Sequence, residues 1–337
     1  MQALVCRNPG ELAVETREHP VVGTGEALVR VRRIGICGTD YHIYEGKHPF
    51  LQYPRVMGHE LAVEIAQAPE GSGFSSGDAV IVNPYLSCGT CVACRHGKPN
   101  CCTKIAVLGV HRDGGMTDYL SLPVGNLLPA DGLTLDQCAT VEFLAIGAHA
   151  VRRGGVGPGD RALVVGAGPI GLGAAIFAGV AGASVHLLDR DVGRLEAIAS
   201  IAGAAGTIAA DGDVDAAIAA ATDGEGFDVV FDATGATGSM LRAFDFVTNG
   251  GRLVLVGVVK DPITFSDPDF HRREMTLFAS RNATMEDFAT VTAGIRAGKV
   301  PVDKIITHRT SLSGAVTDLP RWAQDKSGLI KAVVAID

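Results

Sequence analysis

The spacing of hydrophobic positions changes along the chain and divides it into regions. Up to about residue 145, short apolar runs such as 27–31 and 79–82 are separated by Gly, Pro and Asp turns. Short runs bounded by turn residues are typical of β-structure. We therefore predict a mostly β region over residues 1–145.

Between about residues 146 and 285, apolar strand-like runs alternate with helical patterns. The expected strands are 161–165, 184–188, 227–231, 252–258 and 275–279, and the expected helices are 169–181, 192–202, 213–221 and 238–248. This alternation predicts a parallel sheet with helices on both faces. The strands are nearly all apolar, as strands buried on both sides should be. The predicted fold class is α/β.

The last fifty or so residues continue this pattern only briefly. A helix is expected over 285–297, followed by β-like and mixed pieces that end in 331–335. Because this tail is too short to form a domain, we expect it to rejoin the N-terminal region. The predicted domains are 1–145 together with 286–337, and 146–285.

Composition restricts the class of protein. The chain has 337 residues, 47% of them apolar and 20% charged, which indicates a globular protein long enough for two cores. A net charge of −8 without a basic run argues against nucleic acid or an anionic membrane as partner. We find no signal-peptide pattern and no apolar stretch of membrane-spanning length, so a cytoplasmic location is expected.

A glycine-rich turn joins the first strand and helix of the alternating region. Gly166, Gly168 and Gly171 form a Gly-x-Gly-x-x-Gly pattern, and Pro169 and Ile170 begin the helix. The first glycine allows a tight turn, the second lets the backbone approach a pyrophosphate, and the third permits close packing of helix and strand. The helix N-terminus then holds the phosphate charge. The turn predicts a dinucleotide site.

The residues after the next strands indicate which dinucleotide binds. Asp189 ends the second strand, where a carboxylate accepts hydrogen bonds from ribose hydroxyls and repels a 2′-phosphate, so NAD is favoured over NADP. Arg190 weakens this preference because an arginine there can serve a phosphate, and Arg194 is expected beside the adenosine. Thr234 and Gly257 follow later strands and are expected to line the cofactor groove, although ordinary loop roles also explain them.

Cys88, Cys91, Cys94 and Cys102 form a cluster with the spacing C-x2-C-x2-C-x7-C. Four thiolates on one short loop can surround a Zn²⁺ ion in a closed structural site. Cys101 adjoins Cys102, so one of the two is surplus, and we choose Cys102 as the ligand. An iron site, disulfides and reactive thiols are the alternatives.

A second group of possible ligands is spread along the chain. Cys37, His59 and Glu142 would offer one sulfur, one nitrogen and one oxygen, leaving a fourth metal position open, as a catalytic zinc requires. Each residue alone has a simpler interpretation, as a buried thiol, a hydrogen-bonded histidine or a solvated helix residue. Only the combination indicates a catalytic metal.

Taken together, the motifs Cys37-Gly38-Thr39-Asp40-Tyr41-His42 and Gly58-His59-Glu60, the four-cysteine lobe, Glu142 and the glycine turn resemble the zinc-dependent medium-chain alcohol dehydrogenases over nearly the whole chain. The resemblance implies a GroES-like, mostly β catalytic domain with a structural-zinc lobe at about 84–104, and a Rossmann domain that binds NAD. It implies one catalytic zinc on Cys37, His59 and Glu142, and one structural zinc. A homodimer or homotetramer is also implied.

The resemblance assigns further roles near the catalytic zinc. Thr39 and His42 match the family's proton-relay positions, although a turn cap and a surface histidine are the simpler interpretations. Asp40 is expected to orient His59. Glu60 is expected behind the ligands or as an alternate ligand, since this residue approaches the metal in related enzymes.

The substrate is expected to be a small polar molecule with a secondary alcohol. Segment 44–50, which contains His48, and the triplet Ser280-Arg281-Asn282 look like the hexonate 5-dehydrogenases of sugar-acid catabolism. Arg281 would then bind the substrate carboxylate, with Asn282 and His48 as further candidate contacts. Sorbitol or another polyol, and L-threonine, are the alternative substrates. A non-catalytic NAD-binding structural or sensor protein is the alternative from a different class.

Overall fold

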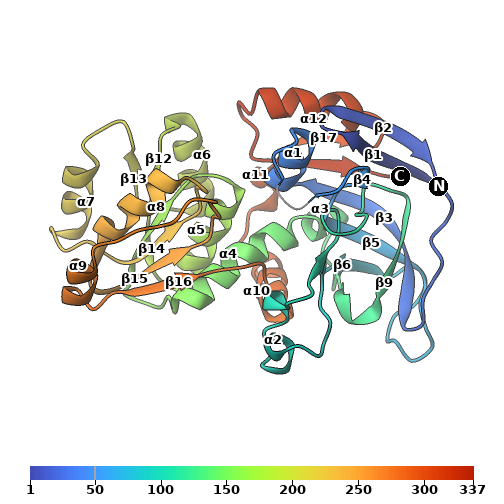
Figure 1. Ribbon diagram of the computed structural model, residues 1–337, viewed down its shortest axis with the longest axis horizontal. Coiled ribbons are helices and arrows are strands. Elements are labelled where there is room, and N and C mark those ends of the chain that lie inside the picture. The colour runs from blue at the N-terminus through green and yellow to red at the C-terminus, as the bar shows by residue number, and fades with distance from the viewer. Residues whose placement is uncertain (49–50) are drawn as a thin grey trace. The chain divides into compact units, whose positions relative to one another are not determined.

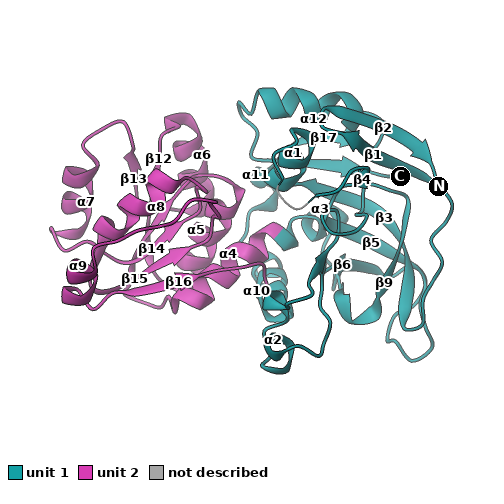
Figure 2. Ribbon diagram, in the orientation of Figure 1, with its two compact units in different colours: residues 1–142, 284–337 teal, residues 143–283 magenta. Residues whose placement is uncertain are grey.

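The computed structural model describes residues 1–48 and 51–337, and the chain divides into two compact units (Figures 1 and 2). Unit 1 comprises Met1–Glu142 and Thr284–Asp337, and unit 2 comprises Phe143–Ala283. Helix α4 (Val141–Gly154) begins in unit 1 and continues into unit 2. Pro49 and Phe50, which belong to the segment 44–50 singled out above, lie outside the described residues.

Unit 1 is built mainly from β-sheets, as Figure 1 shows. Its largest sheet has the strand order β10-β6-β5-β3-β18-β17, with β9 pairing with β3; smaller sheets have the orders β2-β1-β4 and β7-β8. The strands are β1 (Gln2–Asn8), β2 (Glu11–Thr16), β3 (Glu26–Ile36), β4 (Arg55–Val56), β5 (Glu60–Gln67), β6 (Ala79–Val82), β7 (Tyr85–Leu86), β8 (Ala106–Val107), β9 (Tyr119–Pro123), β10 (Leu127–Pro129), β17 (Ile306–Ser311) and β18 (Lys331–Ala335).

Short helices cover or connect these strands. They are α1 (Gly38–Tyr44), α2 (Val92–Arg95), α3 (Leu135–Cys138), α10 (Met285–Arg296), α11 (Val302–Ile305), α12 (Ala315–Gln324) and the 3-10 turns Pro99–Cys101 and Val124–Asn126. The C-terminal tail enters the large sheet directly, because β18 pairs antiparallel with β3 and parallel with β17. In β3 buried positions alternate with more exposed ones at first, and the last three residues, ending at Ile36, are all buried. This buried end of β3 leads straight into the metal-binding segment described below.

Unit 2 contains the predicted parallel sheet, with the strand order β13-β12-β11-β14-β15-β16. Its elements are β11 (Arg161–Val165), α5 (Pro169–Val180), β12 (Ser184–Asp189), α6 (Val192–Ala202), β13 (Gly206–Ala209), α7 (Val214–Thr222), β14 (Phe227–Asp232), α8 (Thr237–Ala243), the 3-10 turn Phe244–Phe246, β15 (Val247–Leu255), α9 (Asp267–Arg272) and β16 (Thr276–Ala279). The central strands β11 and β14 are buried along most of their length, which explains their apolar composition. The α/β fold class is confirmed.

Several predicted boundaries in unit 2 were wrong. The helix expected over 238–248 ends at Ala243, and β15 begins at Val247 rather than at 252 and ends at Leu255. The helix stops at Ala243 because Phe244–Phe246 form a 3-10 turn and Val247 then pairs with Phe227 of β14. Strand β13 was not predicted, since four residues carry little periodic signal. In the part of the chain described, no helix is long and apolar enough to cross a membrane.

Candidate active site and metal centres

Asp40 connects the two segments that carry the first predicted metal ligands. Its Oδ2 accepts the backbone N–H of Cys37 at 2.9 Å, and its Oδ1 accepts that of Gly58 at 3.2 Å. Gly58 has a φ of +91°, a conformation that favours glycine, and His59 follows it. Asp40 was expected to orient the His59 ring. Its two carboxylate oxygens hold the backbone on either side of the site, because these N–H groups need an acceptor.

Glu60 is held by a buried ion pair that the sequence did not suggest. It opens β5 opposite Gly35 of β3, where a side chain would collide with the Glu60 carboxylate. Lys331 Nζ donates to Glu60 Oε1 at 2.7 Å and to Oε2 at 2.6 Å, and both side chains are almost completely buried. The same ammonium donates to the carbonyl of Ile36 at 3.1 Å. Lys331 therefore contacts segments on both sides of the ligands.

Cys37, His59 and Glu60 bring their ligand atoms within 4.8 Å of one another. Glu142 is also buried, and its Oε1 accepts a hydrogen bond from the Tyr85 hydroxyl. Glu142 is not a member of this group, so its place as third ligand stays a prediction. The structure thus offers two buried carboxylates near Cys37 and His59.

The electrostatics of this pocket favour a cation. Burial lowers the pKa of His59, but the neighbouring Cys37, Asp40 and Glu142 charges outweigh it and raise that pKa well above its usual range. Burial raises the pKa of Glu142 to about 7, and the repulsion of Glu60 adds to the rise. Several negative groups thus share one buried space, a cost that a metal ion would offset.

Unsatisfied polar atoms support the same conclusion. Among the described residues, His59 Nδ1 and Glu142 Oε2 are buried without a hydrogen-bond partner. Buried polar atoms of this kind need an explanation, and a missing ion is one. Sulfur, nitrogen and carboxylate oxygen are all donors that Zn²⁺ accepts. The residues present therefore fit a zinc ion.

The predicted relay residues lie on α1, directly after Cys37. The Thr39 hydroxyl is 3.8 Å from the Cys37 sulfur, and His42 is exposed one helical turn further on. Partial burial lowers the pKa of His42, and Lys326 and Lys47 lower it further, against Glu45. His48 is half-buried, and burial lowers its pKa as well. Thr39 and His42 therefore span the distance from the ligands to the surface of this unit.

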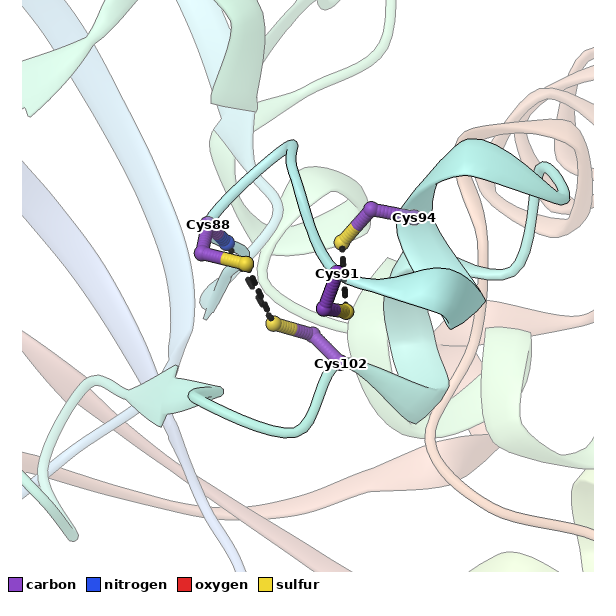
Figure 3. A group of neighbouring side chains, drawn as sticks. All are labelled: Cys88, Cys91, Cys94 and Cys102. Atoms are coloured by element: carbon purple, nitrogen blue, oxygen red, sulfur yellow. Dashed lines mark hydrogen bonds between the residues drawn. The ribbon is translucent and has the colours of Figure 1, made fainter.

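The four-cysteine cluster forms as predicted, and Figure 3 shows the sulfur atoms turned toward one another. The four Sγ atoms lie within 4.8 Å of each other, with 3.5 Å between Cys88 and Cys102 and between Cys91 and Cys94. Cys102 is buried in the cluster whereas Cys101 is exposed, so the structure selects Cys102. Backbone N–H groups lower the pKa of Cys91 to about 5, which favours the thiolate. The set fits a structural zinc.

The glycine turn of unit 2 has the geometry that a dinucleotide needs. Gly166 has a φ of +102°, and a side chain at Gly171 would put its Cβ 1.8 Å from the Gly166 carbonyl oxygen. At Gly168 an added Cβ would meet no atom within 4 Å, which leaves open space before the N-terminus of α5. Pro169 and Ile170 form the first turn of that helix. Phosphate oxygens fit such a helix start.

Asp189 lies beside this turn. Its Oδ2 accepts the N–H of Ala167 at 2.6 Å and its Oδ1 accepts that of Asp191 at 2.9 Å. The following Arg190 is exposed, and Arg194 lies 3.9 Å from the Asp191 carboxylate. The carboxylate is therefore fixed at the end of β12, where a ribose would be recognised.

Thr234 and Gly257 follow β14 and β15 on the same edge of the sheet. The Thr234 hydroxyl donates to the buried Asp232 at 2.7 Å, and a Cβ at Gly257 would lie 2.5 Å from the Gly235 nitrogen. Beyond β16, Arg281 is exposed and Asn282 has a φ of +53°. Both belong to unit 2, and their contact with substrate stays a prediction.

Comparison with known proteins identifies the family. The alcohol dehydrogenase GroES-like domain matches residues 23–132, and the zinc-binding dehydrogenase domain matches residues 169–297. The chain is 43% identical over 335 residues to L-galactonate-5-dehydrogenase of Escherichia coli (strain K12), covering 99% of this chain and 98% of that protein. The chain belongs to the zinc-dependent alcohol dehydrogenase family. It is therefore an oxidoreductase that uses zinc and a nicotinamide nucleotide, and the expectation of an enzyme is confirmed.

Two further members of this dehydrogenase family are less similar in sequence but match over nearly the whole chain. Sorbitol dehydrogenase of Halalkalibacterium halodurans is 31% identical over 322 residues, covering 93% of each chain. The crystal structure of the rspB dehydrogenase of E. coli CFT073 complexed with NADH has a TM-score of 0.92 and 31% identity, and the match covers 100% of this chain and 99% of that one. The dehydrogenase fold is thus shared over the full length.

Two residues that contact the buried carboxylates Glu60 and Glu142 were missed from the sequence. Lys331 starts the otherwise apolar run Lys-Ala-Val-Val-Ala, and buried lysines are rare unless they are paired, which was the available signal. Tyr85 directly follows a proline, Pro84, and carries no spacing relation to Glu142. Only the folded chain places these partners together.

Proposed function

We propose that this dehydrogenase oxidises a secondary hydroxyl of a hexonate, a six-carbon sugar acid, to a ketone and transfers the hydride to NAD. One observation supports this substrate above the others. The chain is 43% identical to an enzyme named for L-galactonate and 31% identical to one named for sorbitol, at similar completeness of coverage. A sugar acid is therefore favoured over a neutral polyol.

The catalytic zinc is assigned to Cys37, His59 and Glu142. Glu142 keeps a buried oxygen without a partner, whereas both oxygens of Glu60 accept hydrogen bonds from Lys331. A zinc ion bound there would supply Lewis acidity toward the substrate hydroxyl. Asp40 holds the backbone of Cys37 and of Gly58, which precedes His59, so this chain provides a preorganised donor set.

Thr39 and His42 are assigned to the removal of the substrate proton. Thr39 lies next to Cys37 and can pass a proton through its hydroxyl, and exposed His42 can release it to water. The lowered pKa of His42 keeps its imidazole neutral near pH 7, which is the form that accepts a proton.

NAD is assigned to the turn at Gly166, Gly168 and Gly171, with Thr234 and Gly257 along the groove. The bound nicotinamide would supply the hydride acceptor. The Asp189 carboxylate favours free ribose hydroxyls and repels a 2′-phosphate, which supports NAD over NADP.

The assignment of substrate is tested by NAD⁺ reduction at 340 nm with L-galactonate, other hexonates, sorbitol and L-threonine. We expect kcat/KM to be highest for a hexonate and to fall at least tenfold with NADP⁺. If activity is highest with sorbitol, the substrate is a polyol, and if it is highest with threonine, the substrate is a hydroxy amino acid. Either result would contradict the hexonate assignment.

Arg281 is assigned to the substrate carboxylate, with Asn282 and His48 as further contacts. An arginine binds a carboxylate through two parallel hydrogen bonds, so Arg281→Ala should raise the KM for a hexonate more than tenfold while leaving that for a neutral polyol nearly unchanged. An equal effect on both substrates would remove Arg281 from the substrate site.

We also assign a homodimeric or homotetrameric state and a cytoplasmic location. The oligomeric state is the one that the resemblance to the family implies, and the location is the one expected from the sequence. Light scattering coupled to size-exclusion chromatography decides the first, and fractionation of the cells that make the protein decides the second.

A further inference from the structure

A cation from the C-terminal tail lies behind the proposed catalytic metal site. Lys331 is the first residue of β18, and the next residue, Ala332, pairs with Ile36 at the end of β3. Its ammonium is 2.7 and 2.6 Å from the two Glu60 oxygens and 3.1 Å from the Ile36 carbonyl. Ile36 precedes Cys37 and Glu60 follows His59. One buried side chain thus contacts a neighbour of each ligand.

The Glu60 carboxylate is near enough to the ligands to bind the same metal. One of its oxygens lies within 4.8 Å of the Cys37 sulfur and of a His59 ring nitrogen. If Glu60 bound together with Cys37, His59 and Glu142, the ion would have four protein ligands and no place for substrate. A catalytic zinc needs that fourth position open.

The two carboxylates differ in their partners. Glu60 is neutralised by Lys331, with both oxygens engaged and the pair excluded from water. Glu142 is hydrogen-bonded to a neutral phenol, Tyr85, through one oxygen only, and its other oxygen has no partner among the described residues. Glu142 therefore gains more from a metal ion than Glu60 does.

We propose that Lys331 is a positioning residue that keeps the Glu60 carboxylate off the catalytic metal and so keeps the substrate position open. This inference rests on the proposed assignment of that metal to Cys37, His59 and Glu142. Without the Lys331 ammonium, Glu60 is a buried carboxylate that has lost its counter-charge, and the metal is the cation within its reach. Glu60 then takes the fourth position on the metal, and no position is left for substrate.

Cobalt-substituted protein reports on the open position without relying on turnover, because the visible bands of Co²⁺ change when an added ligand binds. We use azide as the probe. In the wild type and in Lys331→Arg, azide shifts the bands. In Lys331→Met we expect two cobalt ions per chain, altered bands without azide, and at least tenfold weaker azide binding. Val334→Ala, which removes packing from the same strand, should respond like the wild type.

Two further variants test the route through Glu60. The double variant Lys331→Met with Glu60→Gln has no buried carboxylate to close the site, so azide binding should return to within threefold of wild type. Glu60→Gln alone should bind azide like the wild type, since Glu60 is not a ligand there. Normal azide binding in Lys331→Met, or no recovery in the double variant, would overturn the proposal.

If Lys331→Met does not fold, Glu60→Gln still decides, because a tenfold change in its azide affinity would show Glu60 to be a ligand in the wild type. Failure of the underlying metal assignment looks different. In that case the wild type itself would hold one metal per chain, or would show no spectral response to azide.

Discussion

The four-cysteine cluster allows a sharp test because an ideal control lies next to it. Cys102 is buried in the cluster and Cys101 is exposed beside it. We predict that Cys102→Ser reduces the zinc content from two ions per chain to one, whereas Cys101→Ser keeps two. A serine oxygen cannot replace a thiolate in a four-sulfur site without a large loss of zinc affinity.

The size of the effect follows from the loop that the metal closes. Cys88 and Cys102 bound a loop of about 15 residues, and closing a loop of this length stabilises the folded state by about 3 kcal/mol in the chain-entropy treatment used for cross-links. Helix α2, which carries Cys94, has no buried residue, so burial contributes little to holding this part of the lobe. For a domain of this size, a loss of 3 kcal/mol lowers Tm by roughly 6–12 °C.

Zinc analysis by mass spectrometry and calorimetric melting measure both consequences. Cys101→Ser should match the wild type in zinc content and melt within about 1 °C of it, since an exposed substitution changes stability little. Two zinc ions in Cys102→Ser, or the loss of one in Cys101→Ser, would refute the assignment of the fourth ligand. An unchanged Tm with one zinc lost would refute the loop-closure reasoning instead.

Three further predictions follow from particular groups. Gly171→Ala should weaken NADH binding at least tenfold by fluorescence titration, because its Cβ would lie 1.8 Å from a carbonyl oxygen, whereas Gly179→Ala, on the same helix with free space around it, should leave binding unchanged and raise Tm slightly. In the zinc-loaded protein at pH 8, a chromogenic disulfide reagent should label one thiol, that of Cys101, because burial raises the pKa of Cys6 to about 11 and that of Cys138 to about 12; two or more labelled thiols would contradict this. Since partial desolvation of the ring, together with Lys326 and Lys47, lowers the pKa of His42, its imidazole is neutral near pH 7 and becomes protonated only as pH falls through the lowered pKa, so kcat/KM for oxidation should fall there, and His42→Gln should remove that limb of the pH profile.

The fold could be predicted because its signals are local. The apolar runs of unit 2 mark buried parallel strands, and the glycine turn fixes where the first strand meets its helix. The predicted ends of helices and strands were wrong where the local sequence favours one structure and tertiary contacts favour another. In β15, two glycines follow a polar pair, and the strand is made by pairing with β14 and β16 rather than by its own composition.

The metal sites were predictable to different degrees for a related reason. Cys88, Cys91 and Cys94 are close in sequence, so their spacing alone restricts the geometry, and burial then selects Cys102 over Cys101. Helix α1 and strand β4 lie between Cys37 and His59 along the chain, so these two residues were proposed from short motifs and not from their spacing. The sequence pointed to Asp40 as a partner of His59 but did not show that its carboxylate accepts the backbone N–H groups of Cys37 and Gly58.

Glu60 and Glu142 show most clearly what the chain's fold adds to its motifs. As sequence, both are acids next to apolar residues, and either could be a metal ligand. Their difference arises from partners far away along the chain, a lysine for Glu60 and a phenol for Glu142. Removing one member of a buried ion pair typically costs 3–5 kcal/mol, so the lysine cannot change without a response at Glu60. Because β18 carries that lysine and pairs with β3, which pairs with β5, the strand order of this sheet places a residue of the C-terminal tail against Glu60.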